Sequence, residues 1–108
     1  MKQILFAGPG WYLGNLGESC TNLCLAKGLA CDAATMTDVD DDTKLVKAAL
    51  DAGVTCQVLA DDPGSFTPFY LPNHNGKTQC EHFRNGAKSS CEAVYAGTIN
   101  LQRLCFCK

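Results

Sequence analysis

Short blocks of apolar residues alternate with polar stretches along this chain, and they predict two helices. The first helix is predicted over about 20–27, with Ser19 as its N-cap and Gly28 as its C-terminal stop. The second is predicted over about 43–52, and four residues are expected to form its apolar face: Leu45, Val46, Ala49 and Leu50. Both helices are short, so each must pack against another element to be stable.

Four extended segments are also predicted, and they are 3–7, 54–59, 78–83 and 101–107. Turn chemistry is present at 61–64, and the proline-containing stretch from that turn to about Lys77 is predicted to be irregular. A second turn is predicted at 85–86. Within it, the segment 66–70 is expected to be exposed. The mixture of helices and strands favours one α+β domain over 1–108, in which 1–16 forms an N-terminal strand and a Gly/aromatic loop.

Cysteine usage sets the class of protein, because eight cysteines occur in only 108 residues. An even number in so short a chain predicts four disulfides, which supplement the modest core that 46% hydrophobic residues can form. Such a chain is expected in an extracytoplasmic compartment: secreted, in the lumen of the secretory pathway, or in an organelle such as the thylakoid lumen.

The spacing of the cysteines favours one arrangement. Cys20 and Cys24 lie about 6 Å apart along a helix, at ~1.5 Å per residue. Cys105 and Cys107 lie about 6.6 Å apart on one face of a strand, at ~3.3 Å per residue. Two neighbouring disulfides can therefore hold the first helix on the C-terminal strand, although spacing alone leaves the pairing open. Phe106 is expected to face the other way.

The net charge of −2 and a pI near 5.5 argue against nucleic acid and anionic membranes as partners. No apolar run approaches the ~20 residues of a membrane span. The apolar run at the start is too short for a signal peptide, so secretion implies a targeting segment that was cleaved or lies outside this sequence.

The order of motifs resembles the cysteine-rich C-terminal region of N-acetylglucosaminyltransferase V, a Golgi glycosyltransferase. The resemblance covers 17–107 and rests on a Gly-x-Ser-Cys-x3-Cys start and an Arg-x-Cys-x-Cys end, with counterparts for all eight cysteines. Phe106 departs from it, because the family usually has proline there. The resemblance implies four disulfides: Cys20–Cys105, Cys24–Cys107, Cys31–Cys91 and Cys56–Cys80.

The same resemblance implies a free-standing scaffold, because in that family the catalytic sites lie in large upstream domains absent here. Transferase activity is therefore not expected.

Metal and redox sites are not expected, and no cofactor is predicted. The cysteine spacings of three, six and one residue do not match zinc motifs, and only His74 and His82 could assist. No Cys-x-x-Cys is present for redox chemistry. The acidic run 38–42 is a weak calcium candidate, but acids that precede a helix more simply favour its N-terminal dipole.

Catalysis is not predicted. Glu81 can be paired with His82, and Asp61 or Asp62 with His74, but no serine lies in a nucleophile motif. Gly8-Pro9-Gly10 lacks the remaining residues of a phosphate loop and is expected to be a turn.

Aromatic residues supply the candidate binding sites, and these are Trp11, Tyr12, Phe66, Phe69 and Tyr70. The same side chains can equally cover a small core. From them we expect a non-catalytic structural or protein-interaction module that docks as an accessory subunit on a larger assembly, for example on the lumenal face of a membrane complex such as a photosystem. A lectin-like, glycan-binding module, with Trp11, Tyr12 and the polar loop 73–75, is the alternative.

Overall fold

The computed structural model describes residues 8–84 and 86–108. In chain order, the elements are β1 (Gly10–Leu16), α1 (Cys20–Ala26), α2 (Ala33–Thr37), α3 (Asp42–Asp51), β2 (Val58–Asp62), β3 (Phe69–His74), β4 (Lys77–Phe83) and β5 (Gln102–Cys107). The small α+β domain is therefore confirmed, with three helices in place of the two that were predicted. The strand predicted over 3–7 lies outside the described residues.

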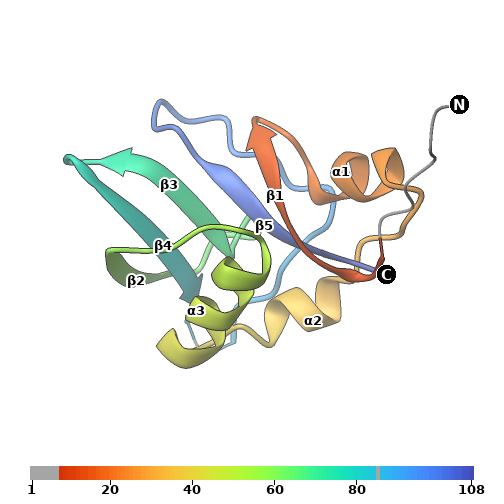
Figure 1. The fold of residues 1–108 in the computed structure, drawn as a ribbon, viewed down its shortest axis with the longest axis horizontal. Coiled ribbons are helices and arrows are strands. Elements are labelled where there is room, and N and C mark those ends of the chain that lie inside the picture. The colour runs from red at the N-terminus through yellow and green to blue at the C-terminus, as the bar shows by residue number, and fades with distance from the viewer. Residues whose placement is uncertain (1–7, 85) are drawn as a thin grey trace, which may run out of the picture.

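The strands form one mixed sheet in the order β1-β5-β3-β4-β2 (Figure 1). Only β2 and β4 pair in parallel, and the other neighbours are antiparallel. The strand that comes last in sequence, β5, lies between β1 and β3. It therefore joins the N-terminal strand to the β3–β4 hairpin.

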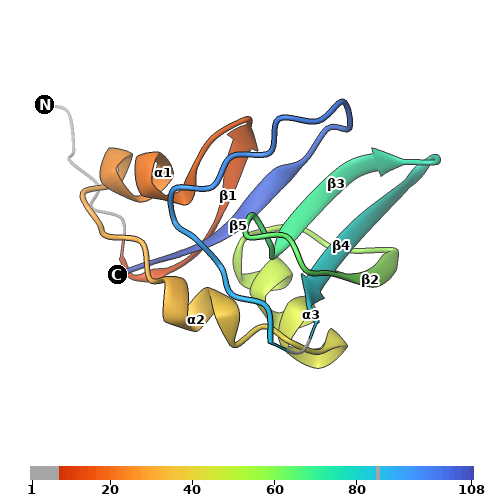
Figure 2. The same ribbon diagram turned by 180° about the vertical axis from the view of Figure 1, so that it is seen from behind.

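Successive residues of β5 point to opposite faces of the sheet, and different helices cover the two faces. Leu104 packs in a cluster with Leu45, Ala48 and Ala49 of α3. Cys105 and Cys107 instead pack with α1, and the 86–101 segment crosses the sheet on the face opposite α3 (Figure 2). The core is thus divided into two layers, one on each side of β5.

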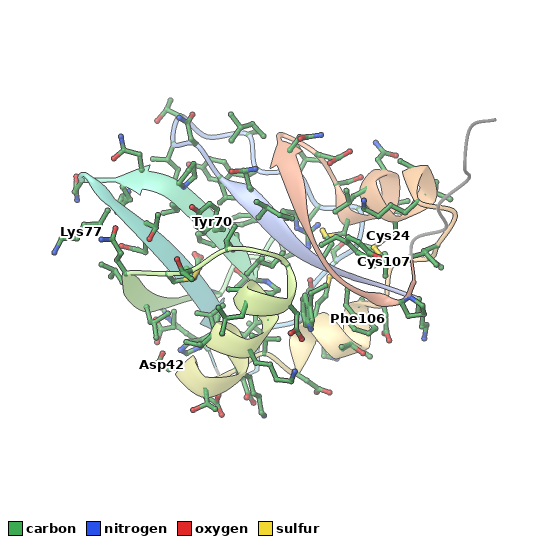
Figure 3. All side chains as sticks on the ribbon, in the orientation of Figure 1. Cys24, Asp42, Tyr70, Lys77, Phe106 and Cys107 are labelled. Carbon is green, nitrogen blue, oxygen red and sulfur yellow. A yellow bond between two sulfur atoms is a disulfide. The ribbon has the colours of Figure 1, made fainter. Side chains whose placement is uncertain are left out.

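All four disulfides have the pairing that the resemblance implies: Cys20–Cys105, Cys24–Cys107, Cys31–Cys91 and Cys56–Cys80. The first two hold α1 on β5, as the spacing argument favoured (Figure 3). Both cysteines of α1 are completely buried.

Local caps explain where the helices begin. The Ser19 hydroxyl accepts a hydrogen bond from the Asn22 amide, and Gly28 follows α1 with a φ of 71°, as predicted. The prediction of two helices was wrong because α2 is only five residues long, too short to give a periodic pattern. Asp32 caps α2, and the completely buried Met36 anchors it.

The predicted irregular region contains a strand. β3 places Phe69 and Leu71 in the core at 2% exposure each, and Asn75-Gly76 turns the chain into β4 with φ values of 54° and 81°. Two successive positive φ angles are typical of a type I′ hairpin turn. The predicted strand over 54–59 is also displaced, since β2 runs to Asp62 through the residues predicted to be a turn.

The apolar face predicted for α3 was partly wrong. Leu45, Ala48 and Ala49 are buried, whereas Val46 and Leu50 are 39% and 55% exposed. Residues three and four apart share a helix face, so 45, 48 and 49 form the buried face. Val46 and Leu50 form a separate apolar pair on the outside.

Arg103 of β5 holds the 86–101 segment, which contains no helix or strand among its described residues. Its guanidinium is 1% exposed and donates to the carbonyl oxygens of Phe66 (3.0 Å) and Ala93 (2.7 Å). Weaker contacts reach the carbonyl oxygens of Cys91 and Ser65 and the Ser89 hydroxyl. Burial lowers the pKa of Arg103 to about 10, so it remains cationic at neutral pH.

Within the described residues, no helix is long and apolar enough to cross a bilayer.

Candidate functional site

The two N-terminal aromatic candidates face opposite sides of the sheet. Trp11 and Tyr12 are successive residues of β1, so their side chains alternate. The Tyr12 ring lies under the ammonium group of Lys27, with 4.4 Å between the Lys27 Nζ atom and the ring centroid. Trp11 instead packs edge to face on Phe106 of the adjacent β5, with ring centroids 5.4 Å apart. The two side chains therefore do not form a single platform.

The expectation of an exposed aromatic segment at 66–70 was wrong. Phe69 is 2% exposed, and Phe66 packs on it and on Tyr95, with centroid distances of 5.6 and 5.2 Å. Tyr70 points to the other face and joins the cluster under α3. These residues stabilise both sides of β3 because a central strand buries both of its faces.

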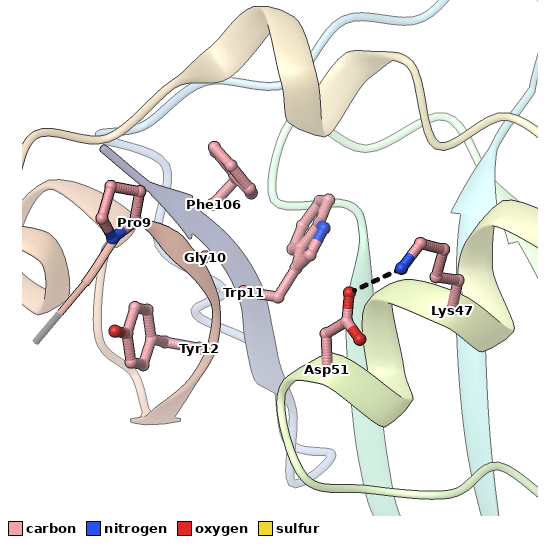
Figure 4. Close-up of a pocket in the computed structure, with 7 residues that line it drawn as sticks. All are labelled: Pro9, Gly10, Trp11, Tyr12, Lys47, Asp51 and Phe106. Atoms are coloured by element: carbon pink, nitrogen blue, oxygen red, sulfur yellow. Dashed lines mark hydrogen bonds and ion pairs between the residues drawn. The ribbon is translucent and has the colours of Figure 1, made fainter.

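An open groove lies between α3 and the β1–β5 pair (Figure 4). Its volume is about 600 Å³, and the residues that line it are Pro9, Gly10, Trp11, Tyr12, Lys47, Asp51 and Phe106. Trp11 and Phe106 supply aromatic surface, whereas the two residues from α3 supply a cation and an anion. The size falls within the range of small-molecule sites.

The charged pair in the groove is exposed. The Lys47 ammonium lies 3.1 Å from a carboxylate oxygen of Asp51, one helical turn away, and their side chains are 78% and 47% exposed. Ion pairs of this kind contribute little to stability, typically ~0.2–1 kcal/mol. Both groups are therefore available to a ligand at little cost to the fold.

Val46 and Leu50 are exposed one turn apart on α3, and neither residue lines the groove. We call these two residues the α3 apolar pair. They lie one position before Lys47 and Asp51 in the helix, so the apolar pair is turned by about 100° around the helix axis from the charged pair.

The acidic run before α3 is used by the helix itself. The Asp41 carboxylate accepts a hydrogen bond from the Lys44 amide at 2.8 Å and thereby caps α3. Asp40 binds the Lys44 ammonium at 2.9 Å, which lowers the pKa of the Asp40 carboxyl. Asp42 lies 3.0 Å from the Nε2 atom of His82. These contacts favour the helix-terminal interpretation over calcium binding.

The histidine pairs considered above do not assemble. His82 points toward α3, whereas its neighbour Glu81 lies on the opposite face of β4 and accepts a hydrogen bond from Gln79 at 3.0 Å. Burial raises the pKa of Glu81. Asp61 pairs with Arg84 at 2.8 Å. Within residues 8–84 and 86–108, no three His, Cys, Asp or Glu side chains gather as a metal site would require.

The polar loop 73–75 belongs to the β3–β4 turn, where the Asn73 side chain accepts a hydrogen bond from the Gly76 amide. This turn lies next to Lys77, at the opposite end of the sheet from Phe106 (Figure 3). The loop therefore cannot share a binding site with Trp11.

Five groove residues were not among the binding candidates from the sequence: Pro9, Gly10, Lys47, Asp51 and Phe106. The orientation of Phe106 was predicted from strand alternation, but its contact with Trp11 depends on the β1–β5 register. The two α3 residues have no sequence signal, because exposed Lys and Asp one turn apart occur on many helices.

No known family model matches this chain, and no curated protein gives a significant match.

Proposed function

We propose that this domain is a non-catalytic protein-interaction module that works in an oxidising compartment. Its four intramolecular disulfides suit an extracytoplasmic environment. Secretion, the secretory lumen and an organelle lumen such as that of the thylakoid all meet this requirement. As an accessory subunit, the domain would dock on a larger assembly, for example a membrane complex such as a photosystem.

The observation that carries this proposal is the exposed α3 apolar pair. Val46 and Leu50 are branched apolar side chains, 39% and 55% exposed, on a helix whose other face is packed. Apolar residues next to a rim of charged side chains are typical of protein-binding surfaces. Lys47 and Asp51 supply such a rim here.

The rigidity of this surface also supports docking. The Cys56–Cys80 disulfide ties the segment after α3 to β4, and Asp42 of α3 contacts His82 of β4. A partner that binds α3 would therefore order little further structure, which reduces the entropic cost of association.

The resemblance to the N-acetylglucosaminyltransferase V module remains a proposal about ancestry. The agreement of all four disulfide pairs supports a shared scaffold. It supplies no substrate, because a scaffold is not a catalytic site.

The test is photocrosslinking of the oxidised domain with a photoreactive residue at position 43, which is exposed on α3. We expect saturable crosslinks to a defined protein in a lumenal or secretory fraction, with unlabelled domain as competitor. Val46→Lys with Leu50→Lys should abolish both the crosslink and the competition.

The matched control is Leu25→Lys with Val94→Lys, at positions that are 66% and 49% exposed outside α3. Equal loss of the crosslink in both double variants would refute docking through α3. Crosslinks that excess unlabelled domain does not reduce would refute it as well.

A further inference from the structure

We propose that the groove between α3 and the β1–β5 pair binds one pyranose ring of a carbohydrate, with Trp11 and Phe106 as the stacking surface and Lys47 and Asp51 as the hydroxyl-binding pair. This ligand class goes beyond protein docking and does not depend on it. The site differs from the lectin-like site predicted from the sequence, because loop 73–75 plays no part in it.

The aromatic wall of the groove is suited to a sugar. A pyranose has one face rich in C–H groups, which pack on the electron-rich face of an aromatic ring. Trp11 is partly exposed in the groove, and its edge-to-face contact with Phe106 extends the apolar surface. Because the two ring planes cross at 72°, one sugar ring can stack on the face of one side chain while its rim contacts the other.

The wall is also held in place before a ligand arrives. Phe106 lies between Cys105 and Cys107, both of which are disulfide-bonded to α1. Trp11 pairs with Phe106 in the β1–β5 ladder. Because the backbone under both rings is fixed, little conformational entropy is lost on binding.

The opposite wall provides the hydrogen bonds that a sugar needs. The Lys47 ammonium only donates and the Asp51 carboxylate only accepts, whereas each sugar hydroxyl can do both. With 3.1 Å between the Nζ and Oδ2 atoms, two neighbouring hydroxyls can bridge the pair. The exposed ion pair can open for them at little cost.

The balance of charges in the groove favours a neutral ligand. The groove holds one cation and one anion among its lining residues, so it offers no excess charge for a phosphate or a nucleotide. It is open rather than a closed apolar tunnel, which disfavours a lipid chain. A neutral hexose fits both properties, and its dozen non-hydrogen atoms give an expected Kd on the order of 1 mM.

The experiment uses Trp11 as its own reporter, because it is the single tryptophan of the chain. The oxidised domain is titrated with the methyl glycosides of glucose, galactose, mannose and N-acetylglucosamine, while the indole N–H resonance and tryptophan emission are followed. We expect a saturable shift with at least one sugar and a loss of affinity of at least about 10-fold in Lys47→Ala and Asp51→Ala, since each removes charged hydrogen bonds.

The matched controls are Asp40→Ala and Lys44→Ala, which remove another exposed ion pair near the N-terminus of α3 (2.9 Å) that does not line the groove. These variants should bind like the unchanged domain. All four positions are solvent-exposed, and unchanged amide spectra outside α3 would show that each variant is folded.

Two results would overturn the proposal. One is the absence of a saturable shift with all four glycosides well above the expected Kd, together with no signal on a glycan array that covers other sugars. The other is equal weakening in the groove variants and the controls. Val46→Lys with Leu50→Lys should leave sugar binding intact, so that failure of docking and failure of sugar binding can be distinguished.

Discussion

The Nε atom of Arg103 donates to the carbonyl oxygen of Phe66 over 3.0 Å, linking two residues 37 positions apart. Arg103 has no carboxylate partner in the contacts described for it, and backbone carbonyls accept most of its hydrogen bonds. Its side chain thus donates the hydrogen bonds that a neighbouring strand would otherwise supply to the backbone carbonyl groups of two irregular segments.

Replacement of Arg103 should therefore destabilise the domain strongly. Arg103→Met leaves several buried carbonyl groups unpaired, at ~1–3 kcal/mol each before relaxation, so we expect a loss of roughly 2–4 kcal/mol. Arg103→Lys should recover only part of it, because three donors on one atom cannot reproduce the planar fork. Denaturant unfolding with the disulfides intact measures both, and full rescue by lysine would contradict this explanation.

Glu81→Gln should make stability less dependent on pH. Burial raises the pKa of Glu81 in the folded state above the ordinary value of 4.5. As pH rises through 4.5, the Glu81 carboxyl ionises more readily in the unfolded chain than in the folded domain, so the free energy of unfolding falls. The glutamine variant avoids this loss. We expect its Tm to exceed that of the unchanged domain by about 1–3 °C at neutral pH and to converge with it below the ordinary pKa. Glu92→Gln, at an exposed position, is the control and should show no such trend.

Gly76→Ala tests the β3–β4 turn. Gly76 has a φ of 81°, where a Cβ is strained even though space is open around it. The expected loss is about 1 kcal/mol in the free energy of unfolding. Gly10→Ala, where φ is not positive and space is also open, should change little. Equal effects would show that the turn does not require the left-handed conformation.

Removal of Cys31–Cys91 should loosen the 86–101 segment selectively. That segment has no strand pairing, so this disulfide and Arg103 are its main anchors. In Cys31→Ala with Cys91→Ala, limited proteolysis should cut first within 86–101. Cys56→Ala with Cys80→Ala should leave that segment protected. Intact mass, measured before either test, should rise by two hydrogens for each disulfide that is reduced. Proteolytic cleavage that begins outside 86–101 in the Cys31→Ala, Cys91→Ala variant would contradict this role of the disulfide.

Local chemistry made much of the fold predictable. Ser19 and Gly28 mark the ends of α1 by capping, and the spacing of Cys20 and Cys24 matches that of Cys105 and Cys107. These signals act over a few residues, so they remain visible in the sequence.

The missed strand has a local reason as well. Pro72 lies inside β3, and proline favours an irregular segment because it cannot donate a ladder hydrogen bond. It falls where the β3–β4 register shifts, between Leu71 and His74, and a bulge of this kind tolerates proline.

The groove was beyond prediction for a different reason. Trp11 and Phe106 come from opposite ends of the chain and meet only through the β1–β5 register. Lys47 and Asp51 join them because α3 buries Leu45, Ala48 and Ala49 rather than the face that includes Val46. Register and helix rotation are decided by the packing of the whole core.

The central position of β5 has a consequence for biosynthesis. Synthesis from the N-terminus makes β5 after every other strand, so its two cysteines are the last of the eight to be made. Until then, Cys20 and Cys24 have no native partner and lie close in sequence to Cys31. Early oxidation would join thiols within this N-terminal group, and those bonds must be exchanged before the sheet can close. Production of the native domain should therefore depend on a disulfide isomerase more than on an oxidant alone.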